Sequence, residues 1–362
     1  MFGPVLALVS TFVLAYAAWR ASSVPWLGGR MGRRPFWSAV AAFWIVMVSG
    51  RLLGHHASFP GAGLLEFAGM TLLGILFLCF LPLLATDLAT GFGAWGRRWL
   101  PRLRGGSLLA GLALATFASI QAFREPEVVD YEVVLPGLPP ARDGLVVVAL
   151  SDLHLGALAG PGWLEARMDQ VRSLRPDLVL FLGDLFEGRD HPDPRSVRTL
   201  RSLRAPLGVW GVEGNHEHYG FAGSPMDGTG IHVLRNGMSV PVPGLVLAGR
   251  AESGRRITGD AGKAWNPPLD RPPGALVLLS HVPGQAQEAA RAGAALMLSG
   301  HTHGGQIWPF GCLVARAYPI LDGATRIGAM TLIVNRGAGT WGPRMRLWRR
   351  GEISRIRLRS AG

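Results

Sequence analysis

Apolar residues are concentrated in the first third of the chain, and charged residues become frequent only after about residue 124. Four apolar segments stand out in that first part, at roughly 1–19, 35–53, 64–85 and 105–123. Each is near the about 20 residues with which an α-helix crosses the hydrocarbon core of a bilayer. We therefore predict an α-helical membrane region over 1–124 with about four transmembrane helices, followed by a soluble domain over 125–362.

The soluble domain begins with short apolar runs that are separated by segments of helical spacing. Residues 127–135 alternate apolar and polar positions, as a half-buried strand does. Continuous apolar runs follow at 145–150, 177–182 and 207–212, and the segment 161–174 has helical spacing of its apolar residues. Repeated strand, helix, strand units indicate a parallel sheet, whose loops gather at the carboxyl ends of the strands.

Further along the chain, the apolar runs are no longer separated by long helices. The runs 244–247, 331–334 and 353–358 predict a second, more antiparallel sheet. The segment 253–273 is polar and rich in proline and glycine, so we expect a long loop that shapes a substrate pocket. The expected fold class of this part is α/β, with mixed strands.

Charged residues make up 17% of the chain and give a net charge of +12, almost all of it from arginine because Lys263 is the only lysine. A basic balance is compatible with nucleic acid, membrane or phosphorylated partners. Basic and aromatic residues do not interleave near the motif loops described below, so no nucleic acid partner is expected. The two cysteines, Cys79 and Cys312, are too few for a disulfide framework or a cysteine-rich zinc site.

The arginines of the membrane region predict its orientation. Four arginines follow the first apolar segment and four lie between the third and the fourth, whereas the intervening loop contains Arg51 alone. Arginine-rich loops face the cytoplasm, so four helices place the soluble domain outside the cell membrane. If one span is miscounted, the soluble domain lies in the cytoplasm instead. Glu66 and Asp87 lie near helix ends, where solvation at the interface explains them. His55 and His56 are interpreted as loop residues.

Polar side chains with metal-ligand chemistry follow five apolar runs, namely 145–150, 177–182 and 207–212 and two more that begin ALVLL and ALML, before His281 and His301. They are Asp152, His154, Asp184, Asn215, His281, His301 and His303, with His216 next to Asn215. The set offers oxygen and imidazole donors but no thiolate, which suits Mn, Fe, Zn or Mg. Seven donors exceed the needs of one site with open positions, so two divalent ions are expected. Two such ions clamp an in-line displacement at phosphorus, and a carboxylate has to bridge them.

The order of these residues resembles the motif series of the calcineurin-like metallophosphoesterases. The series reads Asp152-x-His154, Gly183-Asp184, Gly214-Asn215-His216-Glu217, His281 and Gly300-His301-Thr302-His303. The resemblance covers about residues 128–358, and GHTHGGQIWPFG, NRGAGT and PRMRLWRRGEI are similar to a membrane-associated or exported bacterial branch. Several spans before this domain are also found in animal transmembrane members with a metallophosphoesterase domain. The resemblance implies a two-sheet mixed β sandwich flanked by helices.

The resemblance also implies roles for individual residues. The first metal would be held by Asp152, His154, Asp184 and His303. The second would be held by Asp184, Asn215, His281 and His301, so that Asp184 is the bridge. His216 matches the histidine that contacts the substrate phosphate and protonates the leaving oxygen.

Glu187 and Glu217 depart from the aspartates that are common at these positions of the family. Neither position binds metal in the family, so catalysis is expected to survive. The contacts that orient the ligands are expected to differ.

We therefore expect a membrane-anchored hydrolase that cleaves a phosphomonoester or phosphodiester by attack of a hydroxide that bridges two metal ions. A narrower alternative is hydrolysis of a lipid-linked pyrophosphate such as a nucleotide-activated acyl sugar, a substrate that normally faces the cytoplasm. An alternative of another class is a non-catalytic membrane receptor or scaffold with structural metals. The complete ligand set argues against it, since a degenerate member would usually have lost a ligand.

Overall fold

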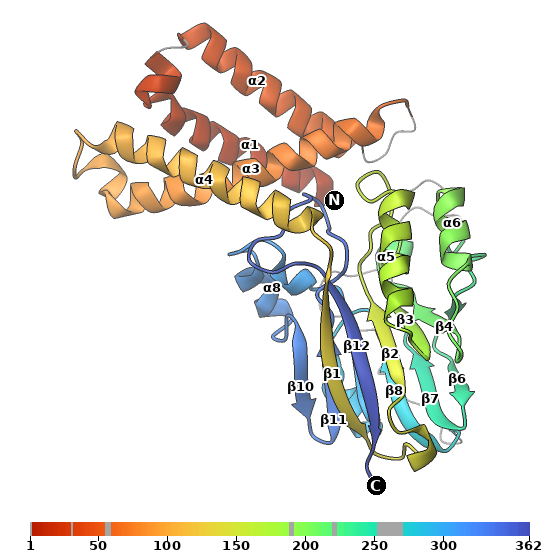
Figure 1. Ribbon diagram of the computed structural model, residues 1–362. Helices are drawn as coiled ribbons and strands as arrows, with labels where there is room; N and C mark the ends of the chain where they lie inside the picture. The colour runs from red at the N-terminus through yellow and green to blue at the C-terminus, as the bar shows by residue number, and fades with distance from the viewer. Residues whose placement is uncertain (1, 30–31, 55–58, 188–191, 219–222, 252–270) are drawn as a thin grey trace. The chain divides into compact units, whose positions relative to one another are not determined.

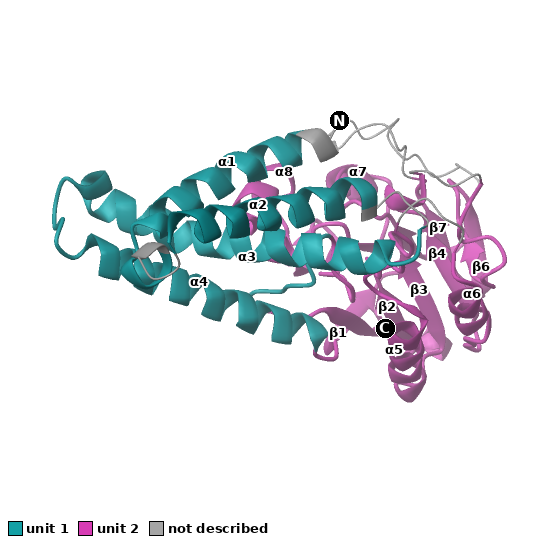
Figure 2. Ribbon diagram, turned by 90° about the horizontal axis from the view of Figure 1, so that it is seen from above, with its two compact units in different colours: residues 1–123, 342–348 teal, residues 124–341, 349–362 magenta. Residues whose placement is uncertain are grey.

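The computed structural model describes residues 2–29, 32–54, 59–187, 192–218, 223–251 and 271–362. The chain divides into two compact units (Figure 2), the first comprising Met1–Phe123 with Gly342–Trp348 and the second Arg124–Trp341 with Arg349–Gly362. Three residues singled out in the sequence, His55, His56 and Lys263, lie outside the described residues, as does most of the loop expected at 253–273.

Four long α-helices form the body of the first unit (Figure 1). They are α1 (Phe2–Ser22), α2 (Arg33–Ser49), α3 (Ala62–Ala89) and α4 (Leu100–Phe123). Short helical turns follow at Pro25–Gly29, Gly50–Gly54 and Gly91–Gly93. Glycines let the helices approach closely, because a Cβ atom on Gly50 would lie 2.7 Å from the Cα atom of Gly69.

Three stretches of the first unit are long and apolar enough to cross a membrane, at Arg33–Leu53, Ala62–Ala89 and Leu100–Phe123. They correspond to the second, third and fourth apolar segments of the sequence. The first segment forms α1, in which the apolar stretch Val5–Ala21 is shorter within the described residues. Three of the four expected helices therefore have the length and composition of transmembrane helices.

Asp87 is not solvated at a membrane interface, as the sequence suggested, but buried among polar partners. It accepts hydrogen bonds from the Tyr16 hydroxyl (2.7 Å) and from Arg104 Nη2 (3.1 Å), and Arg20 Nε lies 2.5 Å from its Oδ2 atom. Glu66 is buried as well, so the interpretation as solvated acids is wrong for both. A buried carboxylate requires such partners, which other helices contribute and the local sequence does not reveal.

A short segment from the far end of the chain, Gly342–Trp348, belongs to the helical unit. The backbone amide of Arg346 donates to the carbonyl of Ala118 at 2.9 Å. Met345 is buried, and a Cβ atom on Gly74 would lie 2.5 Å from its Sδ atom. The segment is therefore packed as closely as the helices themselves.

The second unit contains two six-stranded mixed sheets flanked by helices (Figure 1). In spatial order, the first sheet consists of β1 (Glu127–Leu135), β12 (Glu352–Ser360), β2 (Val146–Leu150), β3 (Leu178–Leu182), β4 (Val209–Val212) and β5 (His232–Val233). The second consists of β10 (Gly323–Ile327), β11 (Met330–Val334), β9 (Leu296–Ser299), β8 (Gly274–Leu279), β7 (Gly244–Gly249) and β6 (Met238–Val242). The helices are α5 (Pro161–Ser173), α6 (Pro194–Arg201), α7 (Ala286–Arg291) and α8 (Gly311–Ala317). The predicted fold class is confirmed.

The pairing of strands gives each sheet a parallel centre. Strands β2 to β5 are parallel neighbours in the first sheet, and β7, β8, β9 and β11 are parallel neighbours in the second. Antiparallel pairs join β12 to β2, β6 to β7 and β10 to β11. The run 353–358, which we assigned to the second sheet, forms β12 of the first. This assignment is wrong because strand pairing is decided by contacts between distant segments, which a local pattern does not contain.

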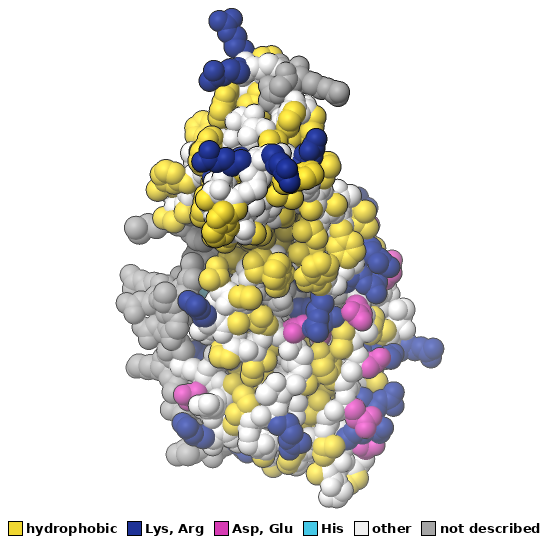
Figure 3. All heavy atoms as spheres, turned by 90° about the vertical axis from the view of Figure 1, so that its left-hand side faces the viewer, with side chains coloured by type: hydrophobic (Ala, Val, Ile, Leu, Met, Phe, Trp, Pro, Cys, Tyr) yellow, Lys and Arg dark blue, Asp and Glu magenta, His cyan; other side chains and the backbone are white. Residues whose placement is uncertain are grey.

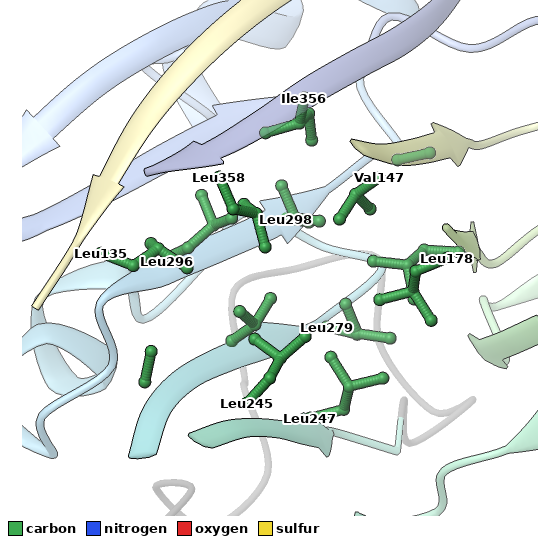
Figure 4. Packing of buried hydrophobic residues seen from close by; sticks show 14 of the residues in the cluster. Leu135, Val147, Leu178, Leu245, Leu247, Leu279, Leu296, Leu298, Ile356 and Leu358 are labelled. Atoms are coloured by element: carbon green, nitrogen blue, oxygen red, sulfur yellow. The ribbon is translucent and has the colours of Figure 1, made fainter. Parts of the chain in front are cut away.

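The core of the second unit lies between the two sheets, where leucines of both interdigitate (Figure 4). In the first sheet Leu178 and Leu180 face this core, whereas Val179 and Phe181 face a second cluster that includes α5. Strands buried on both faces must be apolar at every position. This explains the uninterrupted apolar runs of the sequence and why polar residues begin where the strands end.

Candidate metal centre

The predicted ligands all lie just beyond the carboxyl ends of strands that have parallel neighbours. Asp152 and His154 follow β2, Asp184 follows β3, Asn215 and His216 follow β4, His281 follows β8, and His301 and His303 follow β9. Three strands of the first sheet (β2, β3 and β4) and two strands of the second (β8 and β9) thus contribute residues to a single region. Open α/β sheets bind ligands at this edge.

Five of these residues have a left-handed backbone conformation that side chains other than glycine rarely adopt. They are Asp152 (φ 53°), His154 (φ 48°), Asp184 (φ 51°), His301 (φ 71°) and His303 (φ 51°). Such conformations cost free energy and persist where the surrounding structure enforces them, most often at functional sites. The left-handed turn directs each side chain sharply away from its strand.

Asp152, His154 and His303 form a first buried group of donors. The Nε2 atoms of the two histidines lie 3.2 Å apart, and His303 Nε2 lies 3.3 Å from Asp152 Oδ1. The other carboxylate oxygen of Asp152 is oriented by the Ser151 hydroxyl and by the backbone amide of His301 at 3.0 Å. The arrangement leaves two imidazole nitrogens and one carboxylate oxygen turned toward a common point.

Asp184, His281 and His301 form a second group of donors. Asp184 Oδ2 lies 3.1 Å from His281 Nε2, which in turn lies 3.2 Å from His301 Nδ1. The same Oδ2 atom lies 3.9 Å from His154 Nε2 of the first group. Asp184 is therefore adjacent to both groups.

The donors fit divalent metal ions. Among the described residues, Asp152 Oδ1 and Asn215 Oδ1 are buried oxygens that have no hydrogen-bond partner. A buried polar atom without a partner is costly, and coordination of a cation would relieve that cost. Asn215 lies between Gly214 and His216, and the backbone amide of His216 donates to Asp184 Oδ1 at 2.9 Å.

The outer nitrogens of three histidines are bound to acceptors. Glu187 Oε2 accepts from His154 Nδ1 (2.6 Å) and from His216 Nδ1 (2.8 Å), and the carbonyl of Leu182 accepts from His281 Nδ1 (2.8 Å). Carboxylates and carbonyls only accept, so the proton of each ring sits on Nδ1. For the two candidate ligands among them, His154 and His281, Nε2 then faces the centre, as a metal ligand requires.

Glu217 is not among the candidate metal ligands, but it holds the loops that carry them. Its buried carboxylate accepts hydrogen bonds from the backbone amides of Asp184 (2.9 Å), Leu185 (2.7 Å), Phe186 (3.0 Å) and Gly214 (2.7 Å). The turns after β3 and β4 are thereby tied together.

The buried groups of the centre shift one another's pKa values. Burial lowers the pKa of His281, but Asp184 and Asp152 outweigh it and raise the pKa to about 10. Burial raises the pKa of Asp184, but His281 and His216 outweigh it and hold the pKa well below its usual range. Burial, with repulsion from Asp184, raises the pKa of Asp152. A divalent cation would compete with protons for the same atoms.

The supporting roles of Glu187 and Glu217 were not predicted from the sequence. Both were noticed only as departures from a family pattern. The loop at 335–339 was missed as well: the amides of Ala338 and Gly339 donate to the carbonyls of Ser151 (2.9 Å) and Asp152 (3.0 Å). Its closely spaced glycines, NRGAG, were the available signal, since glycine permits a close approach of two backbones.

Replacement of Gly214 by alanine is expected to impair the centre. The added Cβ atom would lie 2.7 Å from the backbone nitrogen of Asp184 and closer still to its carboxylate. Displacement of this ligand should lower metal affinity or activity by about 10–100-fold, measured by metal titration and by rate. The control is Gly162→Ala in α5, where the added atom meets nothing within 4 Å; equal behaviour of the two variants would contradict the close approach.

Comparisons with known proteins agree with this geometry. The sequence profile described as calcineurin-like phosphoesterase matches residues 145–305. The transmembrane protein with metallophosphoesterase domain of Danio rerio is 31% identical over 277 residues, which are 70% of this chain and 62% of that protein. The protein of the same name from Bos taurus is 29% identical over 367 residues, 90% of this chain and 82% of that protein.

A bacterial relative is similar to nearly the same extent. An uncharacterized metallophosphoesterase of Campylobacter jejuni is 30% identical over 265 residues, which cover 70% of this chain and 69% of that protein. The similarity includes more than two thirds of that protein, and the donors expected of a metallophosphoesterase are gathered at one edge of the two sheets. The chain therefore belongs to the calcineurin-like metallophosphoesterase family.

Proposed function

We propose that this chain is a membrane-anchored dimetal phosphoesterase whose domain over 125–362 hydrolyses a phosphomonoester or phosphodiester. The first ion would be held by Asp152, His154, Asp184 and His303, and the second by Asp184, Asn215, His281 and His301. The observation that carries this proposal is the position of Asp184, whose Oδ2 atom lies within 4 Å of imidazole nitrogens of both groups, at 3.1 and 3.9 Å.

The metal ions, of which Mn, Fe and Zn suit the donors, would supply the Lewis acidity and the nucleophilic hydroxide for in-line displacement at phosphorus. The residues of the chain would orient these ions and limit the access of water, since five of the seven donors are buried. Left-handed backbone at five donors fixes their directions before any ion arrives.

His216 is proposed to protonate the leaving oxygen. Its Nδ1 atom is held by Glu187, and its Nε2 atom lies 3.9 Å from Asp184 Oδ2, on the side of the centre that is partly exposed. Burial lowers the pKa of His216, but Asp184 and Glu187 outweigh it and raise the pKa to about 9. A protonated imidazole beside the phosphoryl group can act as a general acid.

The helical unit is proposed to anchor the enzyme as a multi-pass membrane protein, with the catalytic domain on the outer side. The support is the arginine content of the loops that follow the first and third apolar segments. Reporter enzymes fused after Gly362 would measure the side, and a reporter active only in the cytoplasm would contradict this orientation.

Removal of metal is expected to abolish activity reversibly. The full-length protein in detergent, stripped with a chelator, should lose hydrolysis of an aryl phosphodiester such as bis(p-nitrophenyl) phosphate. Addition of Mn or Zn should restore it, because the donors match these ions. Two ions per chain with no turnover on any phosphoester would favour the receptor or scaffold alternative. Undiminished turnover after complete removal of metal would contradict the proposed mechanism.

A further inference from the structure

The loop that follows the last candidate ligand carries a cluster of exposed apolar side chains. Within the described residues of the second unit, the large exposed hydrophobic side chains are Val134, Val240, Trp308, Phe310 and Leu313. Three of them lie between positions 308 and 313, with 57%, 44% and 61% of their surface exposed. Hydrophobic side chains are grouped on the face of the molecule that carries α8 and β10 (Figure 3). Such clusters mark contact surfaces.

The base of this loop is fixed to the candidate metal centre. Gln306 exchanges two hydrogen bonds with the backbone of Trp341, accepting from its amide (3.0 Å) and donating to its carbonyl (2.9 Å). The ring of Trp341 lies 6.4 Å from the ring of His216. Gly305 and Gly311 close the loop, because a Cβ atom on Gly311 would lie 3.3 Å from the Cα atom of Gly305. The apolar tip therefore cannot move far without moving residues of the centre.

The chemistry of the tip matches a lipid surface. A tryptophan and a phenylalanine are followed by α8, on which Leu313 and Arg316 are three residues apart and both exposed. Residues three apart share one face of a helix, so this face presents an apolar and a basic side chain together. Aromatic residues favour the membrane interface, and basic residues beside apolar ones favour anionic headgroups.

We propose that Trp308, Phe310 and Leu313 insert into the lipid interface of a bilayer, and that the substrate is a phosphate ester of a membrane lipid. The bilayer is chosen as the occupant because the same chain carries three helices of transmembrane length and composition, which would tether the tip to a membrane. The substrate class rests on the proposed phosphoesterase function. Insertion of the tip does not depend on it.

Insertion can be measured without any activity. The chain has two cysteines, of which Cys79 is buried and Cys312 is exposed within the cluster. In a Cys79→Ala background, Cys312 of the full-length protein would carry an environment-sensitive fluorophore, with the protein in lipid nanodiscs whose acyl chains bear a nitroxide quencher. Strong quenching is expected at position 312. The control is a label at Val240→Cys with Cys312→Ser, because Val240 is similarly exposed on β6; equal quenching at the two positions overturns the insertion.

The substrate class is tested by a triple variant, Trp308→Ser with Phe310→Ser and Leu313→Ser. Its kcat/KM on a lipid phosphate ester in vesicles should fall by at least about tenfold, because burial of even one such side chain is worth an order of magnitude or more. Its rate on bis(p-nitrophenyl) phosphate should equal that of the parent, as should both rates of the control Val240→Ser.

The results that would overturn the lipid substrate differ from the result that would overturn the proposed phosphoesterase function. Equal loss on the lipid and on the soluble ester overturns the lipid assignment, as does no loss on either. Absence of turnover on both substrates in the parent protein overturns the phosphoesterase proposal instead, and the quenching experiment still decides whether the tip enters lipid.

Discussion

Replacement of Asp184 by asparagine is expected to abolish hydrolysis while leaving the fold intact. Asparagine has the same shape and tolerates the left-handed backbone at this position (φ 51°), and the amide of His216 still finds an acceptor. The lost charge is what matters: a neutral amide cannot offset two divalent ions, and one of its two arms donates rather than accepts. The imidazoles of His281 and His154, at 3.1 and 3.9 Å, would no longer share an anion.

The expected loss in kcat is at least the about 10²–10³-fold that follows removal of one charge-stabilising group from an active site. Steady-state rates on bis(p-nitrophenyl) phosphate and metal content per chain would measure it together. Asp169→Asn is a matched control, since Asp169 lies on α5 with 73% of its side chain exposed and contacts only Arg172 among the ion pairs described. A fully active Asp184→Asn variant that retains two ions would refute the proposed bridge.

Replacement of Glu217 by alanine is expected to cause the largest loss of stability. Four backbone amides, those of Asp184, Leu185, Phe186 and Gly214, donate to this one buried carboxylate. Each buried amide left without an acceptor costs about 1–3 kcal/mol. The costs are not additive, because water can enter the space vacated by the side chain, but a total above about 3 kcal/mol is expected on the same grounds.

The measurement is the midpoint of thermal unfolding of the full-length protein in detergent. Glu165→Ala provides the control, because Glu165 forms an exposed ion pair with Arg195, and exposed pairs contribute about 1 kcal/mol or less. Glu217→Asp should fall between the two, since an aspartate retains the charge but is one methylene shorter. A Glu217→Ala midpoint equal to that of the control would show that the four hydrogen bonds contribute little.

Sequence patterns predicted the second unit well where burial acts through neighbouring residues. A strand such as β3 is covered on both faces, so its five residues are all apolar, and the first polar residue after Gly183 is Asp184. The same logic located each of the other strand ends. The apolar pattern could not assign β12 to its sheet. That assignment depends on pairing with β1 and β2, which lie more than two hundred residues earlier in the chain.

The residues that support the metal centre could not be predicted from the local sequence pattern, for a similar reason. Glu187 orients two histidines that lie on different loops. Glu217 accepts hydrogen bonds from backbone amides, which every sequence provides and no sequence pattern marks. Asp87 was misjudged because its arginine partners come from α1 and α4. In each case the sequence shows the side chain but not the group that faces it.

The segment Gly342–Trp348 has a consequence for the order in which the protein is made. Helices α1 to α4 leave the ribosome first, whereas the segment that packs against Gly74 and Ala118 emerges about two hundred residues later. At roughly 5–20 residues per second, the helical bundle therefore waits some tens of seconds for its last component. Until then, Gly74 lacks the Met345 side chain that covers it in the finished protein, and the helical unit is completed only when this segment arrives.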